Sequence, residues 1–178
     1  VTSMNNYSYR VTISGACTPA VTSNIVFLTV DEKPEIIADP QDTTVCEGTG
    51  TVFSVNTGVT TNPTYLWQVN DGGGWVTATG GVYINQTTAY LGLTTTNSAM
   101  NGYRYRVIVS GKCAPAITSG EAVLTIREKP EVTVPPANVT ECEDGTVTFT
   151  INAGVTTNPI YQWQVDQGFG FFNISGGI

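Results

Sequence analysis

The chain has 178 residues, of which 40% are hydrophobic and 12% are charged, and its formal net charge is −7. This composition permits a buried core, whereas 7 Lys and Arg residues in total are too few for the clustered basic surface that nucleic acid or an anionic membrane requires. Histidine is absent, which removes the commonest general base and zinc ligand. The sequence therefore predicts no enzyme, no cofactor and no catalytic or metal site, and it contains no apolar run long enough to span a membrane.

The chain repeats itself at an offset of 96 residues. Residues 4–20, MNNYSYRVTISGACTPA, return at 100–116 as MNGYRYRVIVSGKCAPA, and residues 56–69, NTGVTTNPTYLWQV, return at 152–165 as NAGVTTNPIYQWQV. No gap is needed, and 39 of the 82 positions that can be compared are identical. A period near one hundred residues matches one sandwich domain and exceeds the roughly 20 to 50 residues of a solenoid unit. Each repeat is therefore predicted to be one domain.

Two charged stretches that contain proline set the phase of this repeat. Residues 32–34 and 128–130, both EKP, interrupt the strand pattern as linkers between domains do. Residues 34–129 are therefore predicted to form one complete repeat. Residues 1–33 would be the C-terminal part of the preceding repeat, and residues 130–178 the N-terminal part of the next one.

Within the complete repeat, short alternating segments predict an all-β, antiparallel sandwich of seven to nine strands. In chain order, the residues expected to face inward are Thr51, Phe53 and Val55, then Tyr65, Trp67 and Val69, then Leu91 and Leu93, then Tyr103, Tyr105 and Val107. The sequence NDGGG at 70–74 predicts a tight hairpin after the Trp67 strand. We expect Phe53, Trp67, Leu91 and Tyr105 to be buried, and Trp163 to be the core tryptophan of the next repeat.

Trp67 and the sequence MNGYRY at 100–105 resemble the core tryptophan and the tyrosine corner of the immunoglobulin fold. The resemblance identifies Tyr103 as the corner tyrosine, whose hydroxyl would bond nearby backbone. Replacing Tyr103 by phenylalanine would then cost about 1 kcal/mol. Val55 and Tyr105 stand where an antibody domain has its two disulfide cysteines, so apolar packing is expected to hold the sheets together.

A closer resemblance rests on VCEG at 45–48, YLWQV at 65–69, MNGYRYRV at 100–107 and SGKCAPAITS at 110–119. This combination resembles the tandem immunoglobulin-like repeats of very large secreted surface proteins of the Bacteroidetes, which occur in adhesins and gliding-type surface filaments. The resemblance covers essentially the whole chain. It implies an extracellular or cell-surface location and a structural spacer or filament-forming repeat, whose partners are neighbouring repeats or copies of the same protein. The alternatives are an adhesive or carbohydrate-binding module that binds surface glycans, and an accessory domain of an enzyme.

The four cysteines, Cys17, Cys46, Cys113 and Cys142, are too widely spaced for a CxxC motif and are disulfide candidates. In an immunoglobulin-like domain, the turn at Cys46 and the hairpin tip at Cys113 would lie at opposite poles, roughly 25 to 35 Å apart. A disulfide needs Cα atoms within about 7 Å. A bond from a cysteine of the Cys46 type to the Cys113 type of the next repeat is therefore favoured, while a bond within one domain and free thiols remain open.

Other candidate sites rest on short patterns. Trp75 and Tyr83 could form a sugar-stacking platform, although such residues more often cover a sheet edge. The sequence DTT at 42–44 makes Thr43 a possible O-glycosylation site. The sequons at Asn6, Asn85, Asn138 and Asn173 are of the eukaryotic type. The acidic linker residues Glu32, Glu35, Glu128 and Glu131 could suggest calcium, but such residues are usually solvated.

The two incomplete repeats are expected to need a partner for their apolar strand faces. Residues 1–33 supply the closing strands of a sandwich and residues 130–178 its opening strands, so each is expected to leave apolar faces uncovered. A joined tail and head would lack 14 residues (192 minus 178), the equivalent of residues 83–96. We expect these faces to be covered by adjoining sequence or by an adjacent copy in a filament.

Overall fold

The computed structural model describes residues 2–174 of the chain and consists almost entirely of strands and turns. The chain divides into two units, Val1–Ile126 and Arg127–Ile178. Residues 1 and 175–178, at the outer ends of the first and third predicted segments, lie outside the described residues. In the described part of the chain, no helical segment is long and apolar enough to cross a membrane.

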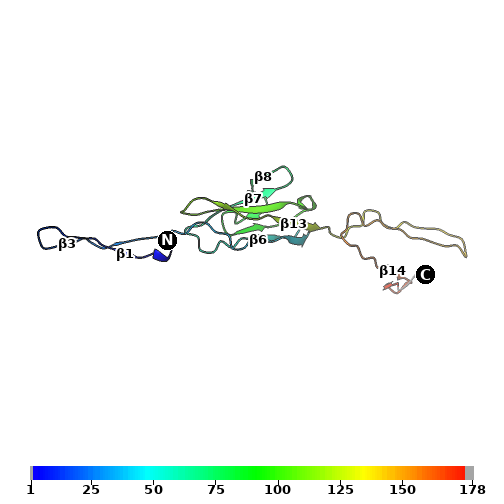
Figure 1. Cartoon of the computed structure of the whole chain (residues 1–178). Coiled ribbons are helices and arrows are strands. Elements are labelled where there is room, and N and C mark those ends of the chain that lie inside the picture. Colours follow the sequence, from blue (N-terminus) through cyan, green and yellow to red (C-terminus); the bar gives the residue numbers. More distant parts are fainter. Residues whose placement is uncertain (1, 175–178) are drawn as a thin grey trace. The chain divides into compact units, whose positions relative to one another are not determined.

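The centre of the first unit is an immunoglobulin-like β-sandwich (Figure 1). Residues 34–129 are all described and contain nine strands, within the predicted range of seven to nine. These are β5 (Thr43–Cys46), β6 (Thr51–Ser54), β7 (Thr64–Asn70), β8 (Trp75–Thr77), β9 (Tyr83–Ile84), β10 (Tyr90–Leu93), β11 (Arg104–Ser110), β12 (Ile117–Thr118) and β13 (Ala122–Arg127), with the 3-10 helix η2 (Ser98–Met100) before β11. One sheet has the order β6-β10-β9, and the other has the order β5-β13-β11-β7-β8 with β12 beside β11. This is the strand distribution of an immunoglobulin-like sandwich.

The two sheets enclose the core that the alternation of the sequence predicts. Phe53, Trp67, Leu91 and Tyr105 are all buried, as expected. The rings of Phe53 and Tyr105, one from each sheet, stack with their centroids 4.6 Å apart. Val55 is buried as well, so the two positions that carry cysteines in antibody domains carry packed apolar side chains here. The sandwich is held together by this packing.

Strands β7 and β11 form the longest pairing in the sandwich and fix its geometry. They run antiparallel over seven residue pairs, from Thr64 opposite Ser110 to Asn70 opposite Arg104. The predicted hairpin follows β7, because Asn70 pairs with Trp75 of β8. The Oδ1 atom of Asn70 accepts hydrogen bonds from the backbone N–H groups of Gly72 and Gly74. Both glycines have positive φ, 107° and 114°, which explains the need for glycine in this turn.

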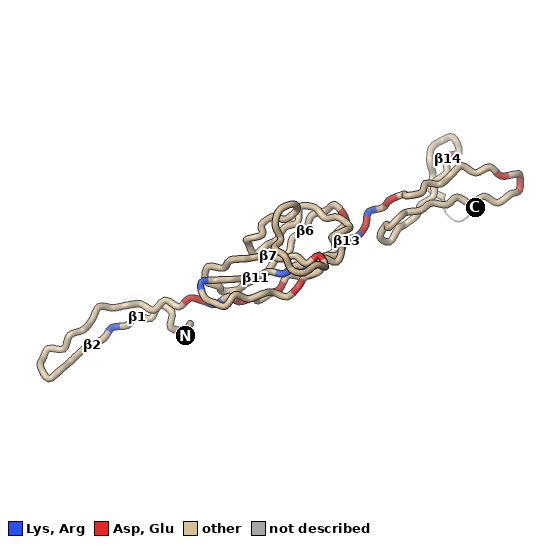
Figure 2. Tube along the Cα trace, turned by 90° about the horizontal axis from the view of Figure 1, so that it is seen from above, with Lys and Arg blue, Asp and Glu red and all other residues tan. Residues whose placement is uncertain are grey.

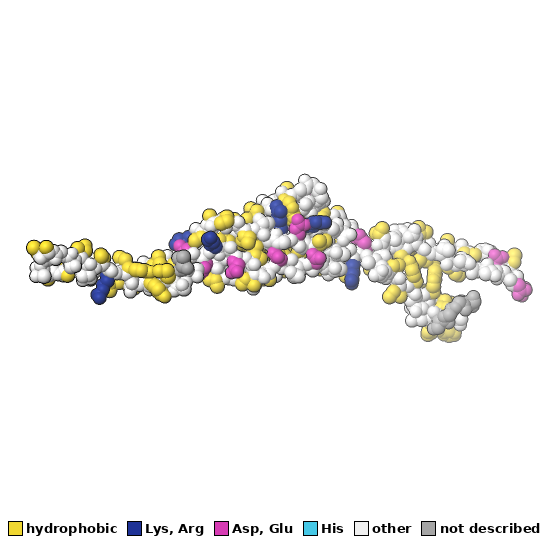
Figure 3. All heavy atoms as spheres, in the orientation of Figure 1, with side chains coloured by type: hydrophobic (Ala, Val, Ile, Leu, Met, Phe, Trp, Pro, Cys, Tyr) yellow, Lys and Arg dark blue, Asp and Glu magenta, His cyan; other side chains and the backbone are white. Residues whose placement is uncertain are grey.

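Residues 2–30 form a long, narrow hairpin. Its elements are the 3-10 helix η1 (Thr2–Met4) and the strands β1 (Ser8–Tyr9), β2 (Thr12–Ile13), β3 (Val21–Thr22) and β4 (Val26–Phe27). Strand β1 pairs with β4, and β2 pairs with β3, both antiparallel. Large apolar side chains are exposed along it (Figure 3), namely Tyr7, Tyr9, Val11, Ile13, Val21, Ile25, Val26 and Phe27. The hairpin therefore has a strand structure without a core of its own.

The described part of the second unit has little regular strand structure. Its regular strands are β14 (Gln164–Asp166) and β15 (Phe171–Asn173), which pair antiparallel. Trp163, expected in the core, is 40% exposed and contacts Phe149, with ring centroids 6.3 Å apart. The role of Trp163 as the core tryptophan of the next repeat stays a prediction, because the described residues of the unit include no equivalents of the strands β9 to β13 that cover Trp67 in the complete repeat.

Candidate functional site

The linker, defined as residues 31–35 around the start of the complete repeat, is bound by a loop of that repeat. The backbone N–H of Glu32 donates to Thr61 Oγ1 at 2.8 Å, and that of Glu35 donates to Thr60 Oγ1 at 3.3 Å. Thr60 Oγ1 in turn donates to the carbonyl oxygen of Thr57 at 3.0 Å, which orients the threonine. The loop between β6 and β7 therefore supplies the hydrogen-bond acceptors that backbone groups in an irregular segment need.

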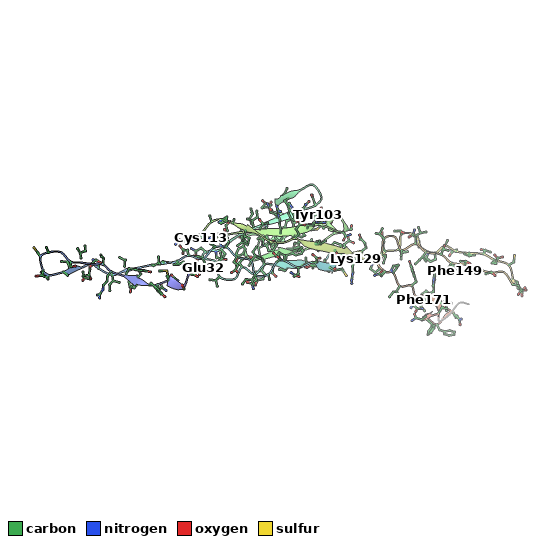
Figure 4. All side chains as sticks on the ribbon, viewed as in Figure 1. Glu32, Tyr103, Cys113, Lys129, Phe149 and Phe171 are labelled. Atoms are coloured by element: carbon green, nitrogen blue, oxygen red, sulfur yellow. The ribbon has the colours of Figure 1, made fainter. Side chains whose placement is uncertain are left out.

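The hairpin between β11 and β12 also contacts this linker. Lys112 Nζ lies 2.8 Å from Asp31 Oδ2, and the thiol of Cys113 lies 3.4 Å from the carbonyl oxygen of Asp31. The hydrogen bond to Asp31 and its negative charge raise the pKa of Lys112. Figure 4 shows Glu32 and Cys113 at the same end of the sandwich, and Figure 2 shows the charged residues of this segment. Because Lys112 is exposed, the ion pair itself contributes little free energy.

The threonine contacts recur in the second unit at positions 96 residues later. The N–H of Glu128 donates to Thr157 Oγ1 at 2.7 Å, and that of Glu131 donates to Thr156 Oγ1 at 3.0 Å. Thr156 Oγ1 also donates to the carbonyl oxygen of Ala153. The ion pair has no such counterpart, since Arg127 stands at the position equivalent to Asp31. The general linker contact is therefore made by the two threonines.

These threonines are functional candidates that the sequence interpretation did not single out. The signal was present, because the sequence GVTTNP is identical at 58–63 and 154–159. This sequence is typical of an ordinary polar loop, however. Nothing in it shows which backbone N–H groups donate hydrogen bonds to the threonine hydroxyls. The acidic linker residues that were considered as calcium ligands donate hydrogen bonds from their backbone N–H groups to the threonine hydroxyls. Among the described residues, no three His, Cys, Asp or Glu side chains gather into a group that could hold a metal ion.

The described residues include all four cysteines and contain no disulfide between them. Cys17, Cys46, Cys113 and Cys142 all carry free thiols. Cys113 lies beside the linker at Asp31, whereas the carbonyl oxygen of Cys46 accepts from Thr96 at the turn after β10. The two cysteines of one repeat thus lie at different turns, which prevents a bond within the domain. A bond between repeats stays a prediction, since the partner position of each cysteine falls outside the 178 residues.

Trp75 and Tyr83 do not form one sugar-binding platform. Trp75 begins β8 in the larger sheet, whereas Tyr83 begins β9 in the smaller one. The guanidinium of Arg106 lies 4.1 Å from the centroid of the Trp75 ring and covers one of its faces. The Nε of Arg106 donates to Gln68 Oε1 at 2.8 Å. The outer face of the larger sheet therefore carries a stacked Trp75–Arg106–Gln68 group.

The predicted tyrosine corner is only partly present. The ring of Tyr103 packs against the core, as expected. Within residues 2–174, however, the hydroxyl of Tyr103 makes no hydrogen bond, and its backbone N–H and carbonyl groups bond Met100 and Leu124 instead. Tyr103→Phe should therefore lower the free energy of unfolding by less than the roughly 1 kcal/mol expected for a tyrosine corner. We predict that Tyr103→Phe changes the free energy of unfolding by less than about 0.5 kcal/mol, measured by denaturant unfolding. A loss of about 1 kcal/mol would indicate that the Tyr103 hydroxyl does form the hydrogen bond of a tyrosine corner.

Tyr83 and Tyr105 form a second structural pair, which lies inside the sandwich. Their hydroxyl oxygens are 3.4 Å apart and their rings meet edge to face. Burial raises the pKa of Tyr105 strongly, and burial also raises that of Tyr83, above the ordinary value of 10.0.

This pair predicts alkaline destabilisation of the repeat. Because the folded state raises both pKa values, the stabilisation is complete below the ordinary tyrosine pKa and is lost as the pH rises above it. As the pH is raised, the unsubstituted chain should begin to unfold at a lower pH than the Tyr83→Phe variant. Near-ultraviolet circular dichroism measures the unfolding. Ionisation of all eight tyrosines in a single step without unfolding would contradict this.

The modification candidates lie on the surface with different accessibility. Thr43 is half-buried at the start of β5, and its hydroxyl donates to the carbonyl oxygen of Gln41 at 3.3 Å. The asparagines of the four sequons, Asn6, Asn85, Asn138 and Asn173, are all exposed. Thr43 glycosylation would therefore require the hydroxyl to give up a local hydrogen bond. It remains a prediction.

The chain was compared with family models, curated proteins and solved structures. No family model matches the chain. Endoglucanase C of Cellulomonas fimi is 30% identical over 142 residues, which is 79% of this chain and 12% of that protein. Sidekick-1 immunoglobulin domains 1–5 give a TM-score of 0.47 at 16% identity, over 68% of this chain and 25% of that one. Drosophila OTK extracellular domains 3–5 give a TM-score of 0.49 at 18% identity, over 81% of this chain and 47% of that one. The chain thus spans a minor part of each of these proteins.

Proposed function

We propose that the chain is part of a tandem array of immunoglobulin-like repeats that acts as a structural spacer or filament in an extracellular bacterial surface protein. The observation that carries this proposal is the linker contact, in which Thr60 and Thr61 bind the segment before one repeat and Thr156 and Thr157 bind the segment before the next. A linker held by hydrogen bonds lacks the freedom of a flexible tether.

The chemistry of the surface supports a structural role over a catalytic one. The chain has no histidine, and the acidic and cysteine side chains of the described residues do not converge. The low charge content and the threonine-rich loops suit an exposed, extracellular protein. On this proposal, repeats and copies of the same protein are the partners, and no enzyme activity belongs to the chain itself.

The similarity to Endoglucanase C favours a second candidate, an accessory module in a carbohydrate-active enzyme or adhesin. A module of this kind would hold or orient a neighbouring domain, or bind a glycan directly. The stacked face of Trp75 argues against glycan binding, because Arg106 covers one side of the indole. A spacer without its own ligand therefore agrees better with the described surface.

Single-molecule pulling would test the proposal. Chains that carry several copies of residues 34–129 between the present flanking segments should unfold in equal steps of roughly 300 Å, since each step releases 96 residues of about 3.4 Å. A glycan array probed with the same protein should show no binding. Continuous lengthening without steps would contradict the spacer, and specific glycan binding would favour the second candidate.

A further inference from the structure

Two tyrosines from different sheets meet inside the complete repeat. Tyr83 begins β9 of the smaller sheet, and Tyr105 lies in β11, the central strand of the larger sheet. Their hydroxyl oxygens are 3.4 Å apart, and their ring centroids are 6.2 Å apart with the rings inclined at 67°. In each ring, the two ortho carbons are bonded to the carbon that bears the hydroxyl. The close approach of the oxygens therefore places the ortho edges of the two rings next to each other.

The packing around Tyr105 selects Tyr83 as its phenol neighbour. Tyr105 is fully buried, and the ring of Phe53 stacks on it with the centroids 4.6 Å apart. Phe53 has no hydroxyl and cannot form a phenoxyl radical. Among the aromatic ring pairs of the described residues, Tyr83 and Tyr105 are the pair that joins two phenols. A radical formed at Tyr105 would therefore meet a second phenol only at Tyr83.

Tyr83 stands on a part of the sandwich that can move. Strand β9 has two residues and lies at the edge of the smaller sheet, where it pairs with β10. Gly80 and Gly81, which precede it, both have positive φ. Such short edge segments belong to the least stable parts of a fold, whereas Tyr105 is held by β7 on one side and β13 on the other. Tyr83 can therefore approach the fixed ring of Tyr105 by the small distance that a covalent bond requires.

We propose that Tyr83 and Tyr105 form a dityrosine crosslink between the two sheets when the protein meets hydrogen peroxide that a haem catalyst activates one electron at a time. The crosslink is a carbon–carbon bond between one ortho carbon of each ring. Tyr105 occupies a position where an antibody domain has a disulfide cysteine, so the link would join the sheets near the place of that disulfide. The inference concerns the interior of one repeat and does not rest on the proposed function.

The reaction balances with one peroxide for each crosslink. Each tyrosine loses one electron and one proton to give a phenoxyl radical, and the two radicals join at their ortho carbons. Each joined carbon then loses its hydrogen as a proton, and a proton returns to each oxygen. The two electrons and two protons removed reduce one hydrogen peroxide to two water molecules, so the chain loses two hydrogen atoms.

The contact between the hydroxyls also provides a path for the proton. Burial raises the pKa of Tyr105, so its proton leaves only as the electron is removed. The hydroxyl of Tyr83 lies 3.4 Å away on a half-buried side chain. It can accept this proton and pass one on to solvent.

Oxidation of the 178-residue chain tests the proposal. All four cysteines are first replaced by serine, because thiolates are readily oxidised. The chain is treated at low concentration with hydrogen peroxide and a small haem complex, and the monomer is isolated and digested for mass spectrometry. The matched variants are Tyr83→Phe, which removes one member of the pair, and Tyr103→Phe, which removes a phenol that packs against the core outside the pair. Circular dichroism checks that each variant is folded.

We expect the cysteine-free chain and its Tyr103→Phe variant to give a monomer that lacks two hydrogen atoms, with Tyr83 joined to Tyr105 in the digest. Tyr83→Phe should lower the yield of this monomer at least about tenfold, because the fold replaces a chance encounter by a fixed one. Oxidation of the cysteine-free chain in denaturant should lose the preference for this pair. Crosslinks at exposed tyrosines alone, or an equal monomer yield from Tyr83→Phe, would overturn the proposal.

Pulling on linked repeats gives a second readout. A bond between positions 83 and 105 prevents the extension of 22 residues (105 minus 83), so oxidation should shorten each unfolding step by about 75 Å. Steps of unchanged length after oxidation would contradict the crosslink. Equal steps before oxidation would still support the spacer, so the two proposals can fail separately.

Discussion

Replacing Trp67 by alanine is expected to lower the free energy of unfolding of the sandwich by about 3–5 kcal/mol. The side chain is fully buried between the sheets, and its Nε1 donates to the carbonyl oxygen of Thr88 at 2.9 Å. The substitution would leave a large cavity and an unpaired carbonyl group. Chemical denaturation of the 178-residue chain, followed by circular dichroism, measures the loss.

Trp163→Ala provides a matched control for this prediction. Trp163 occupies the equivalent position 96 residues later, but it is 40% exposed and lies in the second unit. We expect its replacement to leave the unfolding of the sandwich unchanged within about 0.5 kcal/mol. If both substitutions cost the same, the two units do not differ in packing as described, and Trp67 is not the centre of an independent core.

The double substitution Thr60→Val and Thr61→Val is expected to release the linker from the complete repeat. Valine keeps the shape of threonine but cannot accept the hydrogen bonds from the N–H groups of Glu32 and Glu35. Two bonds at about 0.5–1.5 kcal/mol each predict a loss of about 1–3 kcal/mol. The backbone N–H groups of Glu32 and Glu35 should then exchange with solvent at least about tenfold faster, as measured by hydrogen exchange.

The second unit again supplies the control. Thr156→Val with Thr157→Val removes the equivalent hydroxyls and should accelerate exchange at Glu128 and Glu131, while Glu32 and Glu35 keep their original rates. Unchanged exchange at Glu32 in the first variant would show that the linker is held by other groups, such as the ion pair between Lys112 and Asp31.

Much of the sandwich could be predicted because alternation and turn chemistry are local signals. The inward residues Phe53, Trp67 and Tyr105 follow from period-two patterns, and the turn after Asn70 follows from three consecutive glycines. Both signals need only neighbouring residues, so they survive without knowledge of the partner strands.

The errors concern features that depend on distant parts of the chain. The burial of Trp163 stays a prediction for the same reason, because it requires strands that the described part of the second unit does not contain. Tyr83 reads as a surface aromatic, but it reaches Tyr105 across the two sheets. The Tyr103 hydroxyl lacks its expected acceptor among the described residues. Cys46 and Cys113 lie at different turns, which agrees with the sequence argument against a bond between them.

The stiffness of linked repeats tests the spacer proposal most directly. Small-angle scattering would be measured for chains with two, four and eight copies of residues 34–129 between the present flanking segments. If the threonine contacts fix each linker on the following repeat, the largest dimension should increase by an equal step for every added copy. Growth with about the square root of the number of copies, as in a flexible chain, would contradict the proposal.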